Sequence, residues 1–303
     1  MSWLESEIEK IENKGSNGTG NGAGSGTSKK TAAMYFAAGI VIALVALIVL
    51  SLLWSPGSTG SVKVIRIEGE IYSGNSPNGA NSEYIGSLIR NAADDPLVEA
   101  IVLRIDSQGG VMAAGEEIIA DVEYAKTKKP VITSMGAQAT SAAYHISSHT
   151  DRIFASPDTA TAGIGVIITF YDKSRVYDRE GVVVEPIKSV ETKDAGADYR
   201  GLSSTERKYM QSSVDASGEY FINDILAQRP DVSRSDIDTG RIIRGAEALE
   251  LGLIDEIGNL YQAIDYAKNH KNSIKKDAKK DSKTGDKDTD KKDDEKTDEV
   301  NEE

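Results

Sequence analysis

The chain has 303 residues, of which 39% are hydrophobic, with no cysteine, three histidines and a formal net charge of −13. That length suffices for about two average domains or one large α/β domain. The absence of cysteine excludes thiol nucleophiles, thiolate metal sites and disulfides, and the shortage of histidine argues against most zinc sites and histidine-based triads. A negative charge of this size argues against a nucleic-acid-binding surface, which needs a basic footprint.

Residues 1–30 are polar, and the part from Lys14 to Thr27 has the Gly, Asn and Ser content of a flexible linker. The following segment, 31–54, is predicted to be a single transmembrane helix. Its uncharged core, Ala32–Leu53, has 22 residues, which as a helix would span roughly 33 Å, about one hydrocarbon core. A cleaved signal peptide is the alternative, but the polar leader is too long and no A-x-A-like cleavage site follows.

The basic residues near this segment predict its orientation. Four lysines precede it, including Lys29 and Lys30, whereas the first basic residues after it are Lys63 and Arg66. By the positive-inside rule, residues 1–30 stay in the cytoplasm and the rest of the chain is extracytoplasmic. We therefore expect a single-pass protein of the cell membrane.

The remaining chain divides into a globular domain, 61–270, and a charged tail, 271–303. The tail holds ten Lys and twelve Asp or Glu residues. It has too few apolar side chains to form a core, and it is predicted to be disordered.

The globular domain alternates strand and helix signals, which indicates an α/β fold with a parallel sheet covered on both faces. The nearly continuous apolar run Glu99–Asp106 has the composition of a strand buried on both faces. Strands are predicted at Val62–Ile71, Glu99–Asp106, Pro130–Met135, Arg152–Ala155 and Val182–Ile187. Helices are predicted at Ser82–Ala93, Met112–Ala125, Gln138–Ser148 and Ser204–Ala227, the last with a capping box from Ser203 to Glu206.

Ligand sites in parallel sheets lie beyond the carboxyl ends of strands, and two such ends carry informative residues. Gly109 and Gly110 directly follow one buried strand. They could form a plain tight turn, a phosphate cradle without a recognised motif, or an oxyanion hole built from exposed amides. Ser141 follows the next strand, among small side chains at a predicted helix start. It could be a nucleophile, or Thr140 and Ser141 could simply cap or pack the helix.

A serine nucleophile needs a base, because its hydroxyl is inert at neutral pH. His145 and His149 form an i, i+4 pair that could grip a metal, but the glutamate of an HExxH motif is absent and a packing or surface role is expected. A neutral lysine is the other option. Lys188 and Lys193 both follow the predicted strand 182–187, and composition does not choose between them.

An ordered set of motifs resembles one family, the membrane-anchored serine peptidases of the signal peptide peptidase A type, over roughly residues 62–268. The motifs are R-I-D-S-Q-G-G at 104–110, M-G-A-Q-A-T-S-A-A-Y at 135–144, D-R-I-F-A-S-P at 151–157, T-A-G-I-G-V at 161–166, I-K-S-V-E-T-K-D at 187–194 and G-R-I-I-R-G-A-E-A-L-E-L-G-L-I-D-E-I-G at 240–258. The resemblance implies the Clp protease/crotonase-like fold, a repeated β-β-α spiral. It is preceded here by the transmembrane helix and followed by the charged tail.

The resemblance also implies roles for individual residues. Ser141 matches the family's nucleophile, Lys193 its general base, and Gly109 or Gly110 its oxyanion glycine, with the amide of Ala142 as a second oxyanion donor. No metal or organic cofactor is implied. The family degrades signal peptides left in the membrane and assembles into rings or domes, and in some members the lysine serves the serine of a neighbouring subunit.

This sequence departs from the family pattern at three places. Gln108 replaces a proline before the two glycines, Ala142 and Ala143 replace two glycines after the nucleophile, and Gly163 replaces a serine thought to hydrogen-bond the lysine. The first two changes leave the backbone amides intact. The third leaves open what orients Lys193, for which Ser189, Thr161 or water are candidates.

The expected function is therefore a membrane-bound serine endopeptidase with a Ser/Lys dyad, acting on hydrophobic peptides such as residual signal peptides as a homo-oligomeric ring or dome. Two alternatives stay open. One is a protease of the same fold that cuts a specific membrane partner, as the stomatin-partner proteases do. The other is an inactive crotonase-like scaffold or acyl-binding module.

Overall fold

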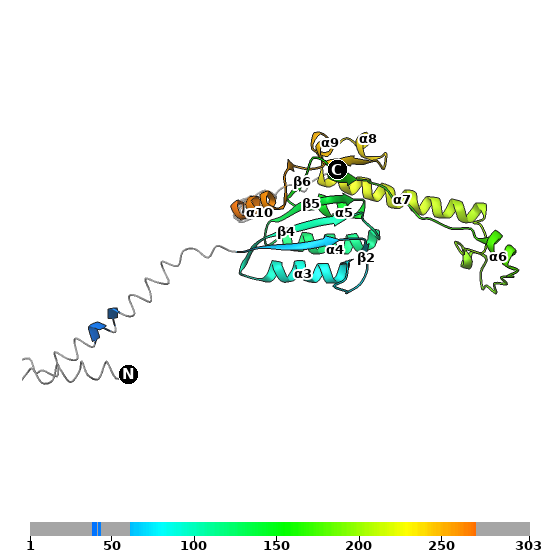
Figure 1. The fold of residues 1–303 in the computed structure, drawn as a ribbon, viewed down its shortest axis with the longest axis horizontal. Coiled ribbons are helices and arrows are strands. Elements are labelled where there is room, and N and C mark those ends of the chain that lie inside the picture. Colours follow the sequence, from blue (N-terminus) through cyan, green and yellow to red (C-terminus); the bar gives the residue numbers. More distant parts are fainter. Residues whose placement is uncertain (1–37, 41, 44–60, 271–303) are drawn as a thin grey trace, which may run out of the picture. The chain divides into compact units, whose positions relative to one another are not determined.

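The computed structural model describes residues 38–40, 42–43 and 61–270 (Figure 1). Segments 1–30 and 271–303 lie outside the described residues, and of the predicted membrane helix, 31–54, only the helical residues 38–40 and 42–43 are described. Within the described residues, no helix combines the length and the apolar character needed to cross a membrane. The account below concerns the globular unit.

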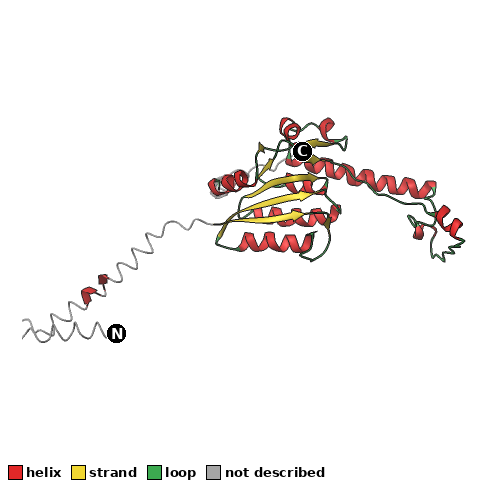
Figure 2. Ribbon diagram, viewed as in Figure 1, coloured by secondary structure: helices red, strands yellow, loops and turns green. Residues whose placement is uncertain are grey.

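Strands and helices alternate along this unit, as Figure 2 shows. The strands are β1 (Ser61–Glu68), β2 (Ile71–Tyr72), β3 (Ala80–Asn81), β4 (Val98–Ser107), β5 (Val131–Thr140), β6 (Arg152–Ala155), β7 (Ala160–Ala162), β8 (Ile242–Arg244) and β9 (Glu256–Ile257). The helices are α3 (Ser82–Asp94), α4 (Met112–Lys126), α5 (Ala142–Ser148), α6 (Ser174–Glu180), the 3-10 helix η1 (Glu191–Asp194), α7 (Ser204–Gln228), α8 (Arg234–Ile237), α9 (Gly245–Glu250) and α10 (Leu260–Asn269).

The main sheet is parallel along the order β1-β4-β5-β6-β9. Strand β7 adds parallel to the end of β5 and pairs antiparallel with β8. A parallel α/β architecture is thus confirmed, as the alternation of elements predicted. It places the ends of β4 and β5 side by side, which is where the two informative loops begin.

Strand β4 shows how the sheet is covered on both faces. Ile101, Leu103 and Ile105 face the larger core, which α3, α4, α5 and the end of α7 complete. The alternate residues Ala100 and Val102 face a second core under α10. The period-two alternation therefore distributes one continuous apolar run between two helix layers.

Helix α7 packs on this body only near its C-terminal end, where Phe221, Ile222 and Ile225 are buried. At its N-terminus the predicted capping box is present: Glu206 N–H donates to Ser203 Oγ, and Ser203 N–H donates to the Glu206 carboxylate. Figure 1 shows α7 extending beyond the sheet, with α6 at its outer end. We refer to residues 166–203, which include α6 and η1, as the arm.

Three predicted elements differ from the structure. Val62–Ile71 is not one strand, because β1 ends at Glu68 and β2 begins at Ile71 in a separate two-stranded sheet. Val182–Ile187 is not a strand but an irregular, exposed part of the arm, with Val183 90% and Ile187 100% exposed. The predicted helix 138–148 begins too early, because β5 continues to Thr140 and α5 starts at Ala142. Strand β5 bulges here: Ile105 pairs with Met135 but Ser107 pairs with Ala139, so extra β5 residues pass over Asp106. Its carboxylate accepts the Gln138 N–H at 3.2 Å.

Candidate active site

Ser141 lies on a sharp turn between β5 and α5 in an unusual backbone conformation. Its φ is 54° and its ψ is −127°, a region that costs a non-glycine residue about 1–3 kcal/mol. The turn is held because Ser141 N–H donates to Ala162 O at 2.8 Å and Ser141 O accepts from His145 N–H at 2.9 Å. The Ser141 side chain makes no capping bond to α5. The turn therefore holds Ser141 in place without a hydrogen bond from its hydroxyl to α5, as expected for a nucleophile.

Gly109 and Gly110 lie directly against this turn. Both have positive φ angles, 96° and 156°. A Cβ on Gly109 would lie 2.8 Å from Ser141 Cβ and 2.8 Å from Thr140 O, and a Cβ on Gly110 would lie 2.2 Å from Ile71 O. Only glycine fits at either position, because the loop approaches the nucleophile on one side and β2 on the other.

The pairing of Ile71 distinguishes the two glycine amides. Ile71 N–H donates to Gly109 O at 2.9 Å, and Val111 N–H donates to Ile71 O at 2.9 Å. Because successive residues of extended backbone point their polar groups to opposite sides, Gly110 N–H faces away from Ile71. Gly109 N–H donates to Ser107 Oγ at 3.0 Å, whereas Gly110 N–H has no hydrogen-bond partner within residues 61–270. Of the two predicted oxyanion glycines, Gly110 is therefore the one whose amide is free to bind a ligand.

A second free amide belongs to Ala142, the first residue of α5, where a helix leaves its N–H groups without intrahelical acceptors. Ala142 and Ala143 are fully buried. The Ala142 methyl lies against Gly115 of α4, where a Cβ would come within 3.4 Å of it. Gly115 thus makes room for Ala142, one of the two alanines that depart from the family pattern.

Thr140 joins the glycine loop to the nucleophile strand, a role that sequence reasoning missed. Its hydroxyl donates to Gln108 O at 3.0 Å and accepts from Gln138 Nε2 at 2.9 Å. This chain of hydrogen bonds sets the spacing between the loop and Ser141. The only sequence signal was the position of Thr140 beside the candidate nucleophile.

An open cleft of about 800 Å³ contains these groups. Its lining residues are Glu70, Gln108, Gly109, Gly110, Val111, Met112, Gln138, Thr140, Ser141, Gly163, Gly165, Val166, Ile167, Gly240 and Ile242. The cleft is large enough for several residues of an extended peptide, and its floor is mostly backbone and apolar side chain.

Three serines near Ser141 in sequence make hydrogen bonds within the fold. Ser147 and Ser148 are buried and donate their hydroxyls to carbonyls of Ala143 and His145. Ser134 is buried and accepts from Arg104. Of the serines that the structure describes, only Ser141 lines the cleft.

Lys193 is not brought to Ser141 within one chain. It is an exposed residue of η1, in the arm, and it is absent from the residues that line the cleft. Thr161, one candidate for orienting the lysine, is buried and donates to Ala139 O at 2.9 Å. Gly163 does line the cleft, beside Thr140.

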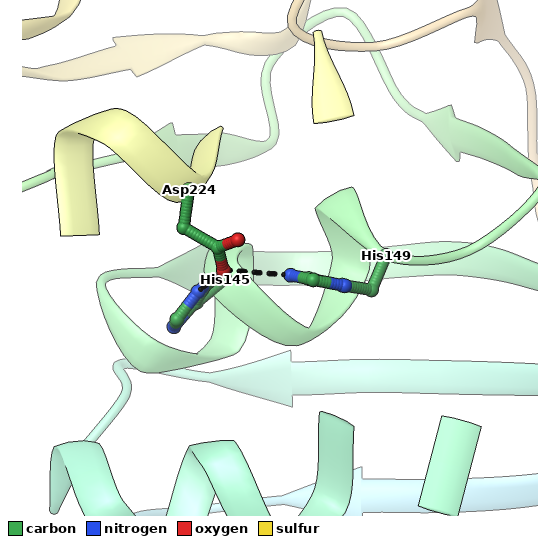
Figure 3. A group of neighbouring side chains, drawn as sticks. All are labelled: His145, His149 and Asp224. Atoms are coloured by element: carbon green, nitrogen blue, oxygen red, sulfur yellow. Dashed lines mark hydrogen bonds and ion pairs between the residues drawn. The ribbon is translucent and has the colours of Figure 1, made fainter. Parts of the chain in front are cut away.

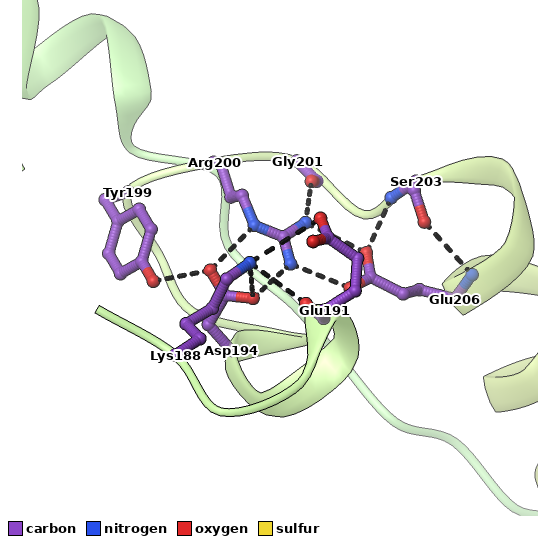
Figure 4. Close-up of polar contacts among 8 residues, drawn as sticks. All are labelled: Lys188, Glu191, Asp194, Tyr199, Arg200, Gly201, Ser203 and Glu206. Atoms are coloured by element: carbon purple, nitrogen blue, oxygen red, sulfur yellow. Dashed lines mark hydrogen bonds and ion pairs between the residues drawn. The ribbon is translucent and has the colours of Figure 1, made fainter. Parts of the chain in front are cut away.

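Lys188, the other candidate base, is held in a polar network (Figure 4). Its Nζ lies 2.9 Å from Asp194 Oδ1 and donates to Glu191 O at 2.9 Å. The hydrogen bond to Asp194 raises the pKa of Lys188, which favours the charged form and makes it unsuited to act as a base.

Arg200 lies at the centre of the same network. Its guanidinium bridges Asp194, at 2.6 Å, and Glu206, at 2.7 Å. Hydrogen bonds from Arg200, Tyr199 and Lys188 lower the pKa of Asp194, and those from Arg200 and Ser203 lower the pKa of Glu206 to about 2. The network ties η1 to the first turn of α7 and so fixes the turn that carries Lys193.

A serine on a strained strand–helix turn, facing a glycine loop with free amides, is the arrangement expected of a serine hydrolase. Comparison with known proteins narrows the class. The sequence model of peptidase family S49 matches residues 123–273. The chain therefore carries a serine peptidase domain of family S49, of the SppA type, which confirms the family predicted from the motifs.

Three relatives show the extent of the similarity. Protease 4 of Haemophilus influenzae is 32% identical over 216 residues, 70% of this chain and 35% of that protein. A putative signal peptide peptidase SppA of Enterococcus faecium is 32% identical over 196 residues, 63% of this chain and 56% of that protein. Capsid assembly protease C of Escherichia phage lambda is 28% identical over 191 residues, 62% of this chain and 44% of that protein. The chain thus spans between about a third and just over half of these relatives.

Proposed function

We propose that this chain is a serine endopeptidase with Ser141 as nucleophile and Lys193 as general base. The observation that carries the proposal is the conformation of Ser141, whose hydroxyl is held by a strained turn at the edge of a cleft, beside two free amides. A Clp protease/crotonase-like fold is part of the proposal, supported by the parallel sheet and the family match.

The proposed reaction uses these groups in sequence. An extended substrate lies along the cleft, where Gly110 offers its backbone polar groups. Neutral Lys193 takes the Ser141 proton as Oγ attacks the carbonyl carbon, and the Gly110 and Ala142 amides stabilise the oxyanion, each by about 2.7–4 kcal/mol. The C–N bond then breaks, the leaving amine receives the proton from Lys193, and water hydrolyses the acyl-enzyme.

We further propose that Lys193 serves Ser141 of a neighbouring copy. Lys193 is an exposed residue of the arm, whose helix α6 lies at the outer end of α7 in Figure 1. The arm exposes large apolar side chains, among them Tyr171 at 70%, Val183 at 90% and Ile187 at 100%. An apolar surface of this kind is typical of an interface, and burial in it would favour the neutral amine.

Proposed substrates are hydrophobic peptides such as signal peptides remaining in the membrane after cleavage. The apolar lining of the cleft and the relative named as a putative signal peptide peptidase support this class. The proposed location is the cell membrane, with a single span at 31–54, residues 1–30 in the cytoplasm and the peptidase domain outside. The uncharged run Ala32–Leu53 supports it. Confinement to one bilayer would raise the effective concentration of substrate.

The test uses the variants Ser141→Ala and Lys193→Ala, separately and mixed, on a fluorogenic hydrophobic peptide. Each variant alone should lose activity. A mixture that assembles together should regain roughly a quarter of parental activity, because one interface in four would pair an intact serine with an intact lysine. Lys188→Ala is the matched control and should remain active.

Parental activity in either single variant would refute the dyad. Activity in neither the variants nor the mixture, with assembled oligomers, would place the dyad within one chain. Labelling of Ser141 by a fluorophosphonate separates an active enzyme from an inactive scaffold.

A further inference from the structure

Figure 3 shows a cluster of two histidines and an aspartate, His145, His149 and Asp224. His145 lies four residues after Ser141, and none of the three lines the cleft. His145 of α5 and His149, the residue that caps the C-terminus of α5, lie four residues apart and so share one face of the helix. Their Nε2 atoms lie 2.5 Å and 2.8 Å from the same oxygen, Oδ2 of Asp224 on α7. The three atoms that could act as ligands lie within 4.8 Å of one another.

The cluster is sheltered from solvent. His145 is 0% and His149 6% exposed, and the rings of Phe221 and Tyr220 flank His145. The Asp224 side chain, 23% exposed, is the part of the cluster that solvent reaches most. Buried imidazoles in contact with one carboxylate are not explained by packing alone, since apolar residues would fill the same space at lower cost.

A fourth residue orients His149. Its Nδ1 lies 2.9 Å from Oε1 of Glu123 on α4, and Glu123 also pairs with Lys126 at 3.2 Å. A carboxylate that accepts from one ring nitrogen holds the proton there and leaves the lone pair on the other nitrogen. Glu123 therefore directs the His149 Nε2 lone pair toward Asp224.

When both imidazoles are neutral, counting hydrogens shows that the cluster lacks one positive charge. Three contacts join a ring nitrogen to a carboxylate oxygen, and each needs a hydrogen or a cation between its atoms. Two neutral imidazoles supply only two hydrogens. His145 Nδ1 has no hydrogen-bond partner among the described residues, so that ring is free to adopt either tautomer.

We propose that His145, His149 and Asp224 bind a divalent transition metal ion of the Zn²⁺ type. Two imidazole nitrogens and one carboxylate oxygen, with water in the fourth position, form a zinc ligand set, and the Glu123–His149 contact is its usual outer partner. Hard ions such as Mg²⁺ and Ca²⁺ prefer sites made of oxygen alone, so they fit less well.

The geometry needs little adjustment to receive the ion. Ligand atoms at zinc distances of about 2.1 Å in a tetrahedron lie roughly 3.4 Å apart. The two nitrogen–oxygen distances of 2.5 Å and 2.8 Å must therefore lengthen by less than about 1 Å, within reach of small side-chain rotations.

Metal binding would join α5 to α7, the two helices that connect to Ser141 and to the arm. Helix α5 begins at the nucleophile turn, and α7 extends to the arm. Only the C-terminal end of α7 packs on the body. A metal ion between α5 and Asp224 would fix that junction, and it would lie apart from the residues that line the cleft.

The test is a Zn²⁺ titration of the full chain against a chromophoric chelator, with excess Mg²⁺ to occupy the carboxylates of residues 271–303. We expect one ion per chain. His149→Gln and Asp224→Asn should weaken binding by more than about 100-fold, and Glu123→Gln by about 10- to 100-fold. His270→Gln, the matched control at the remaining histidine, should bind as the parent does. At 100 times Kd, Zn²⁺ should raise the Tm of the parent by roughly 5–10 °C.

Equal Zn²⁺ affinity in the parent and Asp224→Asn would overturn the proposal. Co²⁺ in place of Zn²⁺ gives an answer even where a variant fails to fold. The parent complex should show the intense visible bands of a four-coordinate, nitrogen-ligated ion, and the weak spectrum of six-coordinate Co²⁺ would refute the site. None of these measurements depends on peptidase activity.

Discussion

The substitution Gly109→Ala tests whether the approach of the glycine loop to Ser141 sets the active geometry. The new methyl would lie 2.8 Å from Ser141 Cβ, 2.8 Å from Thr140 O and 3.0 Å from Ala142 N. Ordinary contacts begin near 3.4 Å, so the loop and the nucleophile turn must separate by about half an ångström or more. Two of the three neighbours are backbone atoms, which cannot move aside as a flexible side chain could.

The expected cost has two parts. The positive φ of 96° adds about 1–2 kcal/mol of backbone strain for alanine, and overpacking adds about 1–3 kcal/mol. The free energy of unfolding should therefore fall by about 2–5 kcal/mol. Activity per folded molecule should also fall, by up to about 100-fold, because a displacement approaching 1 Å at the reacting groups can cost that much.

The assay compares kcat/KM on a hydrophobic peptide with unfolding measured by circular dichroism. Gly252→Ala is the matched control. Gly252 also has a positive φ, 77°, but a Cβ there meets its nearest neighbour, Val232, at an ordinary 3.7 Å. It should lose stability from strain alone and keep its activity. If Gly109→Ala retains more than half of parental kcat/KM, the loop does not set the position of Ser141 and the reasoning is refuted.

Three further predictions concern α7 and the arm. Arg200→Lys, which loses the paired contacts to Asp194 and Glu206, should speed limited proteolysis within the arm several-fold, and an unchanged digestion pattern would contradict the role of the network. Lowering the pH should also weaken this network and loosen the arm. The folded pKa of Glu206 is about 2, below its ordinary 4.5, so its stabilisation is complete above about pH 4.5 and is lost as the pH falls through 2. Hydrogen-exchange protection of residues 188–206 should fall across that range, and a flat profile would count against it. Finally, Phe221→Ala should lower the free energy of urea unfolding by about 3–5 kcal/mol, because the ring is 0% exposed. A loss below about 1 kcal/mol would mean that α7 is not anchored there.

Much of the fold could be predicted because its signals are local. The apolar run at Glu99–Asp106 became β4, and the predicted helix Ser204–Ala227 became α7, with its capping box present. Period-two burial and side-chain caps depend on neighbours within a few residues, so the sequence pattern carries them directly.

The misassigned elements depended on contacts that a local pattern does not contain. The apolar run Val182–Ile187 has the composition of a strand, yet no strand of the sheet lies beside it and its side chains are exposed. The start of α5 was misplaced because small residues favour neither state strongly. The bulge of β5 over Asp106 lets the strand continue to Thr140, so α5 begins only at Ala142.

The candidate site divides in the same way. It could be predicted that Ser141 and the two glycines lie close together, because they follow neighbouring strands of a parallel sheet. The choice between the Gly109 and Gly110 amides was not, because it depends on the pairing of Ile71, which is distant in sequence. Likewise, His145 and His149 are only a spaced pair until the fold brings Asp224 to them.

The exposed arm has a consequence for control of the enzyme. With Lys193 carried outside its own cleft, the proposed arrangement makes a solitary copy catalytically silent, since its serine has no proton acceptor. Self-association would then act as the activating step, as removal of a pro-segment does in a zymogen. Specific activity would rise with enzyme concentration, and newly made copies would be harmless to surrounding proteins until enough of them had gathered.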